Sequence, residues 1–237
     1  MVSTRHHPND FSPPSAPTSA LRAVTKPGWS HTPSTLVTIW LLVSNPVVLW
    51  DASYMFLRPH SMPGGSLHTP WTPYALYGTI DYLYGWPAYN SRNGFSAAQS
   101  ALNLVECVCY IFYLVVIYRY GASAGHRASK NTQKGAMWLL TAEKHVSGRM
   151  AAIALLVVFS SCIMTVSKTV MYGLIEAFSG FQYIGHNDVL TLIFLWIVPN
   201  GFWIVFPSYA AYFFGREILG AMESAGGASQ ATGSKES

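Results

Sequence analysis

The chain has 237 residues and a formal net charge of +4, and only 10% of its residues are Asp, Glu, Lys or Arg. Hydrophobic residues make up 51% of the chain and aromatic residues 14%. A soluble domain of this size needs far more charge, so the composition excludes an ordinary soluble globular protein. We attribute the positive charge to membrane topology, and we expect no nucleic-acid partner.

The first 33 residues are rich in Pro, Ser, Thr and His, with no apolar run and no small-residue cleavage site. They predict a disordered tail rather than a signal peptide. Four apolar stretches follow, at about 36–57, 97–118, 150–177 and 189–214, and each exceeds the roughly 20 residues that a helix needs to cross a bilayer. The sequence therefore predicts an all-α, polytopic membrane protein, a four-helix transmembrane bundle over residues 34–219. Residues 220–237, mainly Gly, Ala and Ser, predict a second disordered tail.

Charge is distributed unequally between the loops. The segment between the second and third spans contains one acid, Glu143, and six basic residues: Arg119, Arg127, Lys130, Lys134, Lys144 and Arg149. The positive-inside rule therefore predicts that both tails and this loop are cytosolic, and that loops 59–96 and 178–188 are luminal or exterior. The basic loop is expected to attract anionic membrane lipids. The Pro- and Tyr-rich loop 59–96 predicts an ordered cap over the luminal mouth of the bundle.

Cysteine and histidine spacing gives no sign of a metal site. All three cysteines, Cys107, Cys109 and Cys162, lie inside predicted spans and suggest neither a disulfide framework nor a zinc site. His60 and His68 are eight residues apart, with no Cys or third His nearby. We therefore expect no metal and no cofactor, and interpret the cysteines as packing residues.

Polar residues inside the spans recur at helical spacing, so each span has one polar stripe. The stripes consist of Ser44 and Asp51; of Gln99, Asn103, Glu106, Tyr110 and Tyr113; of Ser161, Thr165, Lys168, Tyr172 and Glu176; and of Trp196, Asn200, Trp203 and Pro207. Pro46 is expected to bend the first helix. A polar stripe must face protein rather than lipid, so the four stripes predict one shared cavity.

Three charged residues inside the spans are the strongest functional candidates. A charge at mid-bilayer costs about 3 kcal/mol, so Asp51, Glu106 and Lys168 need either a function or a partner. For Lys168, a catalytic role and a structural ion pair with a carboxylate both stay open. Interhelical hydrogen bonds, worth about 0.6 to 2 kcal/mol, also explain Ser161, Thr165 and Asn103.

Four segments together point to a family. They are SNPVVLWDASYMFLRP (44–59, with Asp51), YGTIDYLYG (77–85, with Asp81), GFSAAQSALNLVECVCYIFYL (94–114, with Glu106), and residues 170–209 with Glu176, His186, Asn200, Trp203 and Pro207. In order and spacing they resemble the emopamil-binding protein and sigma-two receptor superfamily, whose shared four-helix unit is called the EXPERA domain. The resemblance covers roughly residues 36–216. Two departures stand out: Val47 replaces a His that the family's sterol isomerases have, and a polar tail replaces their extra N-terminal span.

The resemblance implies acid-base chemistry on a lipophilic substrate. Family enzymes shift a double bond by protonating one alkene carbon and removing a proton from its neighbour. We expect Glu106, kept protonated by apolar surroundings, to be the acid, and Asp51 to be the base. Aromatic faces would stabilise the carbocation. The expected substrate-binding residues are Asn103, Tyr110, Lys168, Tyr172, Glu176, Trp196, Asn200, Trp203 and Asp81.

Several alternatives stay open at this point. The substrate is a sterol or terpenoid alkene or epoxide, and the sequence does not decide between isomerisation and cyclisation. The sigma-two branch implies instead a non-catalytic protein that binds sterols or cationic amphiphiles. A transporter is disfavoured because the chain has neither an inverted repeat nor a pair of broken helices. Placement in the endoplasmic reticulum follows from the resemblance alone, as does the option of a homodimer.

Overall fold

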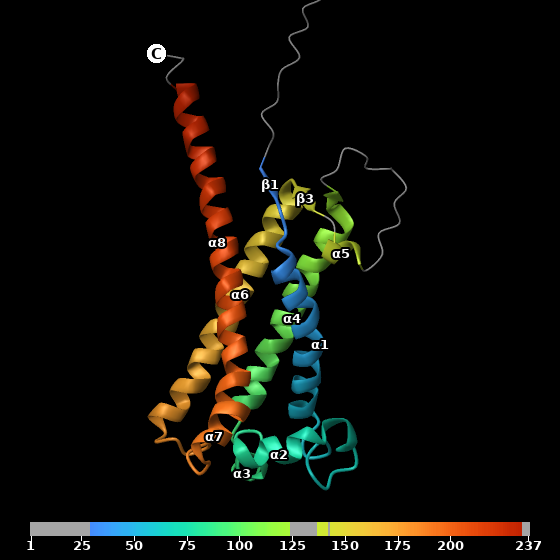
Figure 1. Cartoon of the computed structure of the whole chain (residues 1–237), viewed down its shortest axis with the longest axis vertical. Helices are drawn as coiled ribbons and strands as arrows, with labels where there is room; N and C mark the ends of the chain where they lie inside the picture. Colours follow the sequence, from blue (N-terminus) through green and yellow to red (C-terminus); the bar gives the residue numbers. More distant parts are fainter. Residues whose placement is uncertain (1–28, 124–136, 142, 234–237) are drawn as a thin grey trace, which may run out of the picture.

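In the computed structural model, which describes residues 29–123, 137–141 and 143–233, four long helical runs lie alongside one another (Figure 1). The first three are α1 (Thr35–Phe56), α4 (Phe95–Tyr120) and α6 (Arg149–Phe178). The fourth run consists of α7 (Val189–Leu192), the π-helical turn η2 (Ile193–Ile197) and α8 (Val198–Gly233). The predicted all-α, four-helix architecture is confirmed.

The four runs have the length and composition of membrane spans. The candidate spans are Thr35–Phe56, Phe95–Tyr120, Arg149–Phe178 and Val189–Gly226. Large apolar side chains on all four runs point away from the bundle and are exposed, among them Val43, Val108, Val170 and Phe202. Lipid tails would cover such surfaces at no cost, so the chain is a multi-pass membrane protein.

Local sequence explains where the helices start and bend. Thr38 donates a 2.8 Å hydrogen bond to the carbonyl of Ser34, the N-cap of α1. Asp188 caps α7 by accepting from the backbone N–H of Thr191 at 3.0 Å and from its hydroxyl at 2.6 Å. These bonds hold the pKa of the Asp188 carboxyl below 3.8. Pro46 and Pro207 lie inside α1 and α8, where each removes one backbone donor.

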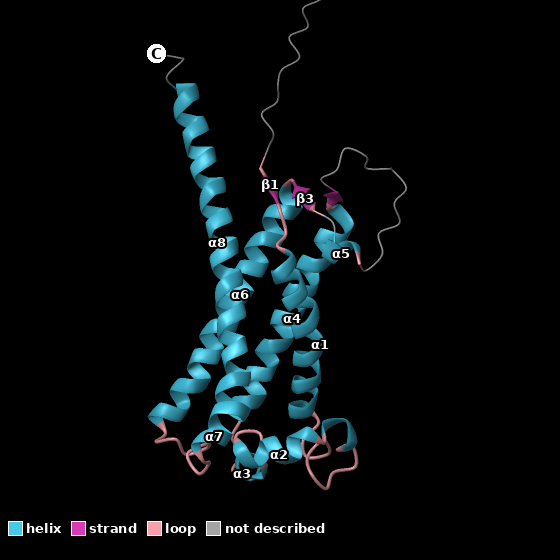
Figure 2. Cartoon of the chain, viewed as in Figure 1, coloured by secondary structure: helices cyan, strands magenta, loops and turns pink. Residues whose placement is uncertain are grey.

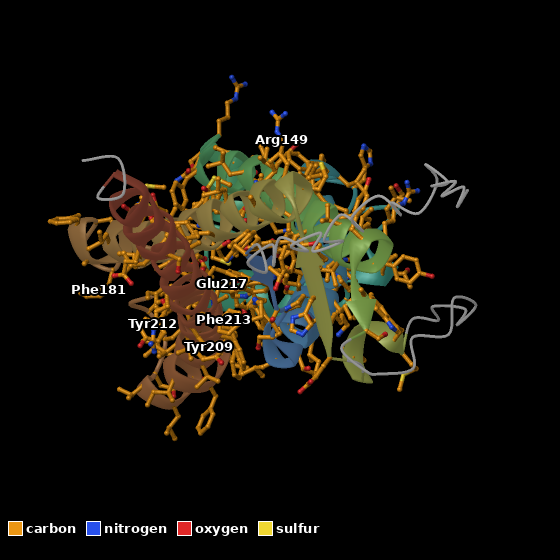
Figure 3. The ribbon with its side chains drawn as sticks, turned by 90° about the horizontal axis from the view of Figure 1, so that it is seen from above. Arg149, Phe181, Tyr209, Tyr212, Phe213 and Glu217 are labelled. Carbon is orange, nitrogen blue, oxygen red and sulfur yellow. The ribbon has the colours of Figure 1, made fainter. Side chains whose placement is uncertain are left out.

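A small sheet closes one end of the bundle. Its strands are β1 (Ser30–His31), β2 (Ala122–Ser123) and β3 (Lys144–Ser147), in the antiparallel order β1-β3-β2, with the short helix α5 (Trp138–Thr141) beside them. The described part of the chain starts with β1 and stops with the last turn of α8 on this side of the molecule, and Figure 1 shows α2 (Pro73–Ile80) and α3 (Trp86–Asn90) at the opposite end. Arg149, at the start of α6, is exposed and points away from the bundle (Figure 3).

The predicted N-terminal tail, residues 1–33, extends too far along the chain. Residues 29–33 belong to the folded unit, because β1 pairs with β3 and His31 is buried. His31 Nδ1 lies 2.8 Å from Glu217 Oε2, and its Nε2 lies 2.8 Å from the Tyr113 hydroxyl. These two contacts join residues 29–33, the N-terminal strap, to α4 and α8. Glu217 is labelled on α8 in Figure 3.

The C-terminal tail was also predicted to start too early. Helix α8 continues past residue 219 to Gly233, because the Ala- and Ser-rich segment contains no Pro that would end it. Residues 1–28 and 234–237, and residues 124–136 and 142 of the basic loop, lie outside the described residues.

The loop 59–96 is folded, as predicted, and Figure 2 shows its short helices joined by loops at one end of the bundle. It contains the 3-10 turn η1 (Thr69–Trp71), α2 and α3. Trp71 and Tyr74 pack with Tyr54 and Met62 in a small core beneath α1. The larger core, which includes Leu41, lies toward the sheet end of the bundle, so the half nearer α2 is left for a cavity.

Candidate functional site

A cavity of about 450 Å³ lies between the long helices and α2. This volume is within the roughly 300–1,000 Å³ that small-molecule sites occupy. The four predicted polar stripes do converge on it. The stripe residues that line the cavity are Ser44, Asp51, Gln99, Asn103, Glu106, Tyr110, Thr165, Lys168, Tyr172, Asn200 and Trp203.

An ion pair in the cavity wall joins α4 to α6. Lys168 Nζ lies 3.0 Å from Glu106 Oε1, and both side chains are buried. Lys168 also donates to Asn103 Oδ1. The pair cancels its own charge, which is the arrangement that a low-dielectric interior requires.

The other oxygen of Glu106 ends a chain of hydroxyl groups. The Thr165 hydroxyl lies 2.9 Å from Glu106 Oε2 and 2.7 Å from the Tyr110 hydroxyl. When Thr165 donates to the carboxylate, Tyr110 donates to Thr165, so every bond has one donor and one acceptor. Two residues of α6 therefore hold the Glu106 carboxylate, Lys168 at Oε1 and Thr165 at Oε2.

Asp51 lies in a separate, tyrosine-lined part of the cavity. Tyr74 donates to Asp51 Oδ1, and the Tyr84 hydroxyl lies 3.4 Å from Oδ2. The rings of Tyr74 and Tyr84 stack with centroids 5.7 Å apart, and Tyr77 meets Tyr84 edge-on at 5.0 Å. No cation forms an ion pair with Asp51 among the described residues, so this carboxyl is the uncompensated acid of the cavity.

Aromatic rings also line the side of the cavity between α1 and α8. Trp40 meets Trp203 edge-on at 5.0 Å and stacks on Phe206 at 4.6 Å. Trp40 and Trp203 line the cavity, as does Trp50 farther along α1. Rings from both helices therefore face the same space that contains Asp51.

Three predicted substrate-binding residues are not part of the lining: Asp81, Glu176 and Trp196. Asp81 is fully buried and accepts from Tyr172, from Trp196 Nε1 at 3.0 Å and from Leu83 N at 2.9 Å. Burial raises the pKa of Asp81 above 3.8 despite these donors. Asp81 therefore ties the cap to α6 and η2 and does not lie at the cavity mouth.

Glu176 has a similar anchoring position. It is buried, and its Oε2 accepts from the backbone N–H of Tyr183 at 3.3 Å, which holds the loop after α6. Glu176 lies on the same side of α6 as the other residues of the third polar stripe. The cavity lining on α6 stops at Tyr172, one helical turn before Glu176. Helical periodicity gives the face of a helix and not the depth of a cavity.

Several lining residues were missed by the sequence analysis. The main ones are Trp40, Asn45, Trp50, Tyr74, Tyr77 and Tyr84. Tyr74 and Tyr77 are three residues apart at the start of a short helix, a spacing that places them on one face. That signal was present in the loop 59–96, but nothing in the sequence shows that this face turns toward Asp51.

The cysteines and acids give no sign of a metal centre within the described residues. Cys107, Cys109 and Cys162 are free thiols, and no group of three His, Cys, Asp or Glu side chains is placed to hold an ion in that part of the chain. No family model, curated protein or solved structure matches the sequence or the fold. The site therefore has to be interpreted from its own geometry.

Proposed function

We propose that this cavity is the active site of a membrane-embedded isomerase or cyclase, which protonates an alkene or epoxide of a sterol or terpenoid and guides the resulting carbocation. We also propose that the chain shares the EXPERA-type four-helix unit. The observation that supports the proposal best is the presence of two distinct carboxyl centres, Asp51 and the Glu106–Lys168 pair, in one aromatic-lined cavity within the membrane spans.

The proposed cycle starts at the ion pair. A proton moves from Lys168 Nζ to Glu106 Oε1 across their 3.0 Å contact, which replaces two buried charges by two neutral groups. Glu106 gives this proton to one alkene carbon and becomes a carboxylate again. Asp51 removes a proton from a neighbouring carbon, and the double bond has shifted. Transfer of that proton from Asp51 to neutral Lys168 restores the starting state, so no proton is gained or lost.

The aromatic lining suits a cationic intermediate. Each desolvated ring face contributes about 1–2 kcal/mol to holding a cation, and Trp203, Tyr110 and Tyr172 line the cavity. At the cation stage of this cycle Asp51 and Glu106 are both carboxylates and Lys168 is neutral, so the two negative charges of the cavity stabilise the bound cation. Loss of a proton from the cation to Asp51 gives isomerisation. Attack by an internal alkene or hydroxyl closes a ring, and Asp51 then accepts the proton that the resulting cation or oxonium ion releases.

A second candidate function is binding without chemistry. Lys168 neutralises Glu106, and this leaves Asp51 as a single negative charge beside Tyr74 and Tyr84. A protonated amine on a lipophilic scaffold would pair with Asp51 and lie against these rings. In this alternative the protein binds sterols or cationic amphiphiles, and the Glu106–Lys168 pair is structural.

Cellular placement forms part of the proposal. We place the protein in the endoplasmic reticulum membrane, with both chain ends cytosolic. The even number of spans puts both ends on one side, which is where Figure 1 shows β1 and the end of α8. The excess of Lys and Arg in the loop between α4 and α6 supports the cytosolic assignment of that side.

The test is expression of the full chain in a yeast that lacks its own sterol isomerase, with mass spectrometry of the sterol and terpenoid fraction. Restored flux that Glu106→Gln and Asp51→Asn each abolish would support the enzyme. Matched controls are Glu223→Gln and Asp188→Asn, which change the same side chains at exposed positions outside the cavity. Full turnover in both cavity variants would refute the acid and base assignment.

An inactive wild-type protein that is present in the membrane calls for the second arm. Membranes are then supplied with prenylated terpenoid substrates, and with a radiolabelled lipophilic amine as a binding probe. Binding that Asp51→Asn abolishes, without turnover of any substrate, would favour the binding protein. Turnover of a prenylated substrate that depends on Glu106 would favour the specialised terpenoid enzyme.

A further inference from the structure

Among the described residues, four amide side chains line the cavity, and one of them has an uncommitted nitrogen. The amide nitrogens of Asn45, Gln99 and Asn200 each donate to a backbone carbonyl, at 2.6, 3.2 and 2.8 Å. The fourth is Asn103, which is half-buried, and its Nδ2 donates to no residue that the structure describes. Polar groups in a protein interior are nearly always hydrogen-bonded. The two hydrogens of this amide are therefore available to a ligand or to a water.

The contact with Lys168 fixes which atom of the Asn103 amide is free. Lys168 donates to Asn103 Oδ1, and its Nζ lies 3.0 Å from Glu106 Oε1. A flipped amide would bring two donors together, so Oδ1 is the atom that meets Lys168 and Nδ2 is the free atom. Asn103 and Glu106 are three residues apart on α4 and lie on one face of the helix. A free hydrogen-bond donor is therefore placed beside the proposed acid.

A plain alkene offers nothing to this donor. An alkene carbon has no lone pair, so a hydrocarbon bound against Glu106 would cover the Asn103 amide and leave its hydrogens without an acceptor. The oxygen of an epoxide has two lone pairs. One can accept from Asn103 Nδ2 while the other takes the proton of Glu106, so one atom satisfies both side chains.

We propose that Asn103 is a specificity-determining residue that binds the oxygen of an epoxide, and that the substrate is a lipophilic epoxide rather than a plain alkene. This inference rests on the proposed function, because Glu106 is the acid in both. It adds the chemical group on which that acid acts, and the residue that selects this group.

The epoxide replaces only the first step of the proposed cycle. Glu106 gives its proton to the epoxide oxygen as one C–O bond breaks, and the electron pair of that bond stays on the oxygen. The oxygen becomes a hydroxyl group, and the carbon that it leaves becomes the carbocation. An internal alkene attacks this carbon and closes a ring, and the new cation releases a proton to Asp51. Negative charge develops on the oxygen as the C–O bond breaks, so the hydrogen bond from Asn103 strengthens in the transition state.

The first test measures turnover by the purified full chain in lipid nanodiscs. The substrates are the terminal epoxide of geranylgeranyl acetate and geranylgeranyl acetate itself, with products identified by mass spectrometry. The key variant is Asn103→Asp, because a carboxylate can still accept from Lys168 but has no hydrogen to donate. We expect it to lower kcat/KM for the epoxide about a hundredfold, with the larger part of the loss in kcat.

Gln99→Leu is the matched control for Asn103→Asp. Gln99 is a cavity amide one turn earlier on α4, and its nitrogen is already bonded to a backbone carbonyl at 3.2 Å. Its replacement should change turnover of the epoxide and of the alkene by the same factor. Turnover of the alkene but not of the epoxide, or an equal loss for both substrates in Asn103→Asp, would overturn the role of Asn103 and leave the proposed function standing.

The second test needs neither a variant nor turnover. The wild-type protein is offered two unreactive analogues of the epoxide, which have an oxetane or a cyclobutane ring at the same end of the chain. The rings are similar in size, but only the oxetane has an oxygen that can accept from Asn103. We expect the oxetane to bind about tenfold more tightly, a difference typical of one added hydrogen bond.

The two tests together separate this inference from the proposed function. Tighter binding of the oxetane in a protein that turns over neither substrate would support the oxygen site and count against the enzyme. Equal binding of the two analogues would mean that a water alone satisfies the Asn103 amide, and would overturn the inference. Failure of both analogues to bind would overturn it as well.

Discussion

Lys168 on α6 and Glu106 on α4, both inside candidate membrane spans, form an ion pair with Nζ 3.0 Å from Oε1. Either residue alone would leave a charge in a low-dielectric site. Their energetic interdependence is therefore the first property to measure, and it decides how any loss of activity in a Glu106 variant is to be interpreted.

We expect Glu106→Gln and Lys168→Met to destabilise the protein by about 3–5 kcal/mol each, because each leaves an unpaired buried charge. The double variant should recover most of this loss, since both charges are then gone. Thermal unfolding in nanodiscs measures the effect, with Glu223→Gln as the exposed control. Simple addition of the two single losses would show that the side chains are not coupled. A stable but inactive double variant would separate catalysis from folding.

Thr165 connects Tyr110 to Glu106, and its removal tests the hydroxyl chain. Thr165→Val keeps the shape but leaves the Tyr110 hydroxyl and Glu106 Oε2 each short of one partner. We expect a loss of about 1–3 kcal/mol in the free energy of unfolding. The control is Thr169→Val, because the Thr169 hydroxyl donates to the backbone carbonyl of Thr165 at 2.9 Å and to no other described residue. Equal effects of the two substitutions would contradict a special role for Thr165.

The spans and their polar faces could be predicted because each depends on periodicity within one helix. Glu106, Lys168 and Asp51 were found in this way, and the structure places all three in one cavity. Their partners could not be predicted, since the sequence leaves open which carboxylate meets Lys168. Asp81 shows the limit of the approach: an acid in a Tyr-rich loop gives no sign of whether it faces a cavity or a buried triad of donors.

The tails show the same limit for a different reason. Residues 29–33 have the composition of a tail, yet a single side chain, His31, makes two long-range bonds that fix them to α4 and α8. Composition averages over a segment and does not register one residue with two distant partners. Asn45 was missed similarly, because an amide next to Pro46 is unremarkable until the structure shows that the residue lines a cavity.

Asp81 should make stability depend on pH. Burial raises the pKa of Asp81 above 3.8, so the folded protein binds this proton more tightly than the unfolded chain does. The stability contributed by Asp81 is therefore fully present below pH 3.8 and is lost as the pH rises through the raised pKa. Asp81→Asn removes this titration, so its unfolding temperature should fall less than that of the wild type between about pH 4 and pH 7.

Asp188 provides a control of opposite sign for that experiment. Its pKa is lowered, so its contribution is present above pH 3.8 and is lost as the pH falls through the lowered pKa. Asp188→Asn keeps a residue that can cap the helix. It should reduce the pH dependence of the unfolding temperature only at the acidic end of the pH range. If the wild type and Asp81→Asn showed the same dependence of unfolding temperature on pH, the effects of burial and of the three hydrogen-bond donors on the pKa of Asp81 would cancel.

His31 should hold the N-terminal strap to the bundle. Its Nδ1 contacts Glu217 and its Nε2 contacts the Tyr113 hydroxyl, so both ring nitrogens have a hydrogen-bond partner. His31→Ala leaves both partners short of a bond, so we expect a loss of about 1–3 kcal/mol in unfolding free energy. Hydrogen exchange at residues 29–34 should increase more than exchange in the spans. His60→Ala is the matched control, because His60 is exposed and lies in the loop 59–96, outside the sheet. If His31→Ala leaves exchange at residues 29–34 unchanged, the pairing of β1 with β3 is sufficient to hold the segment, and the two bonds of His31 serve α4 and α8 alone.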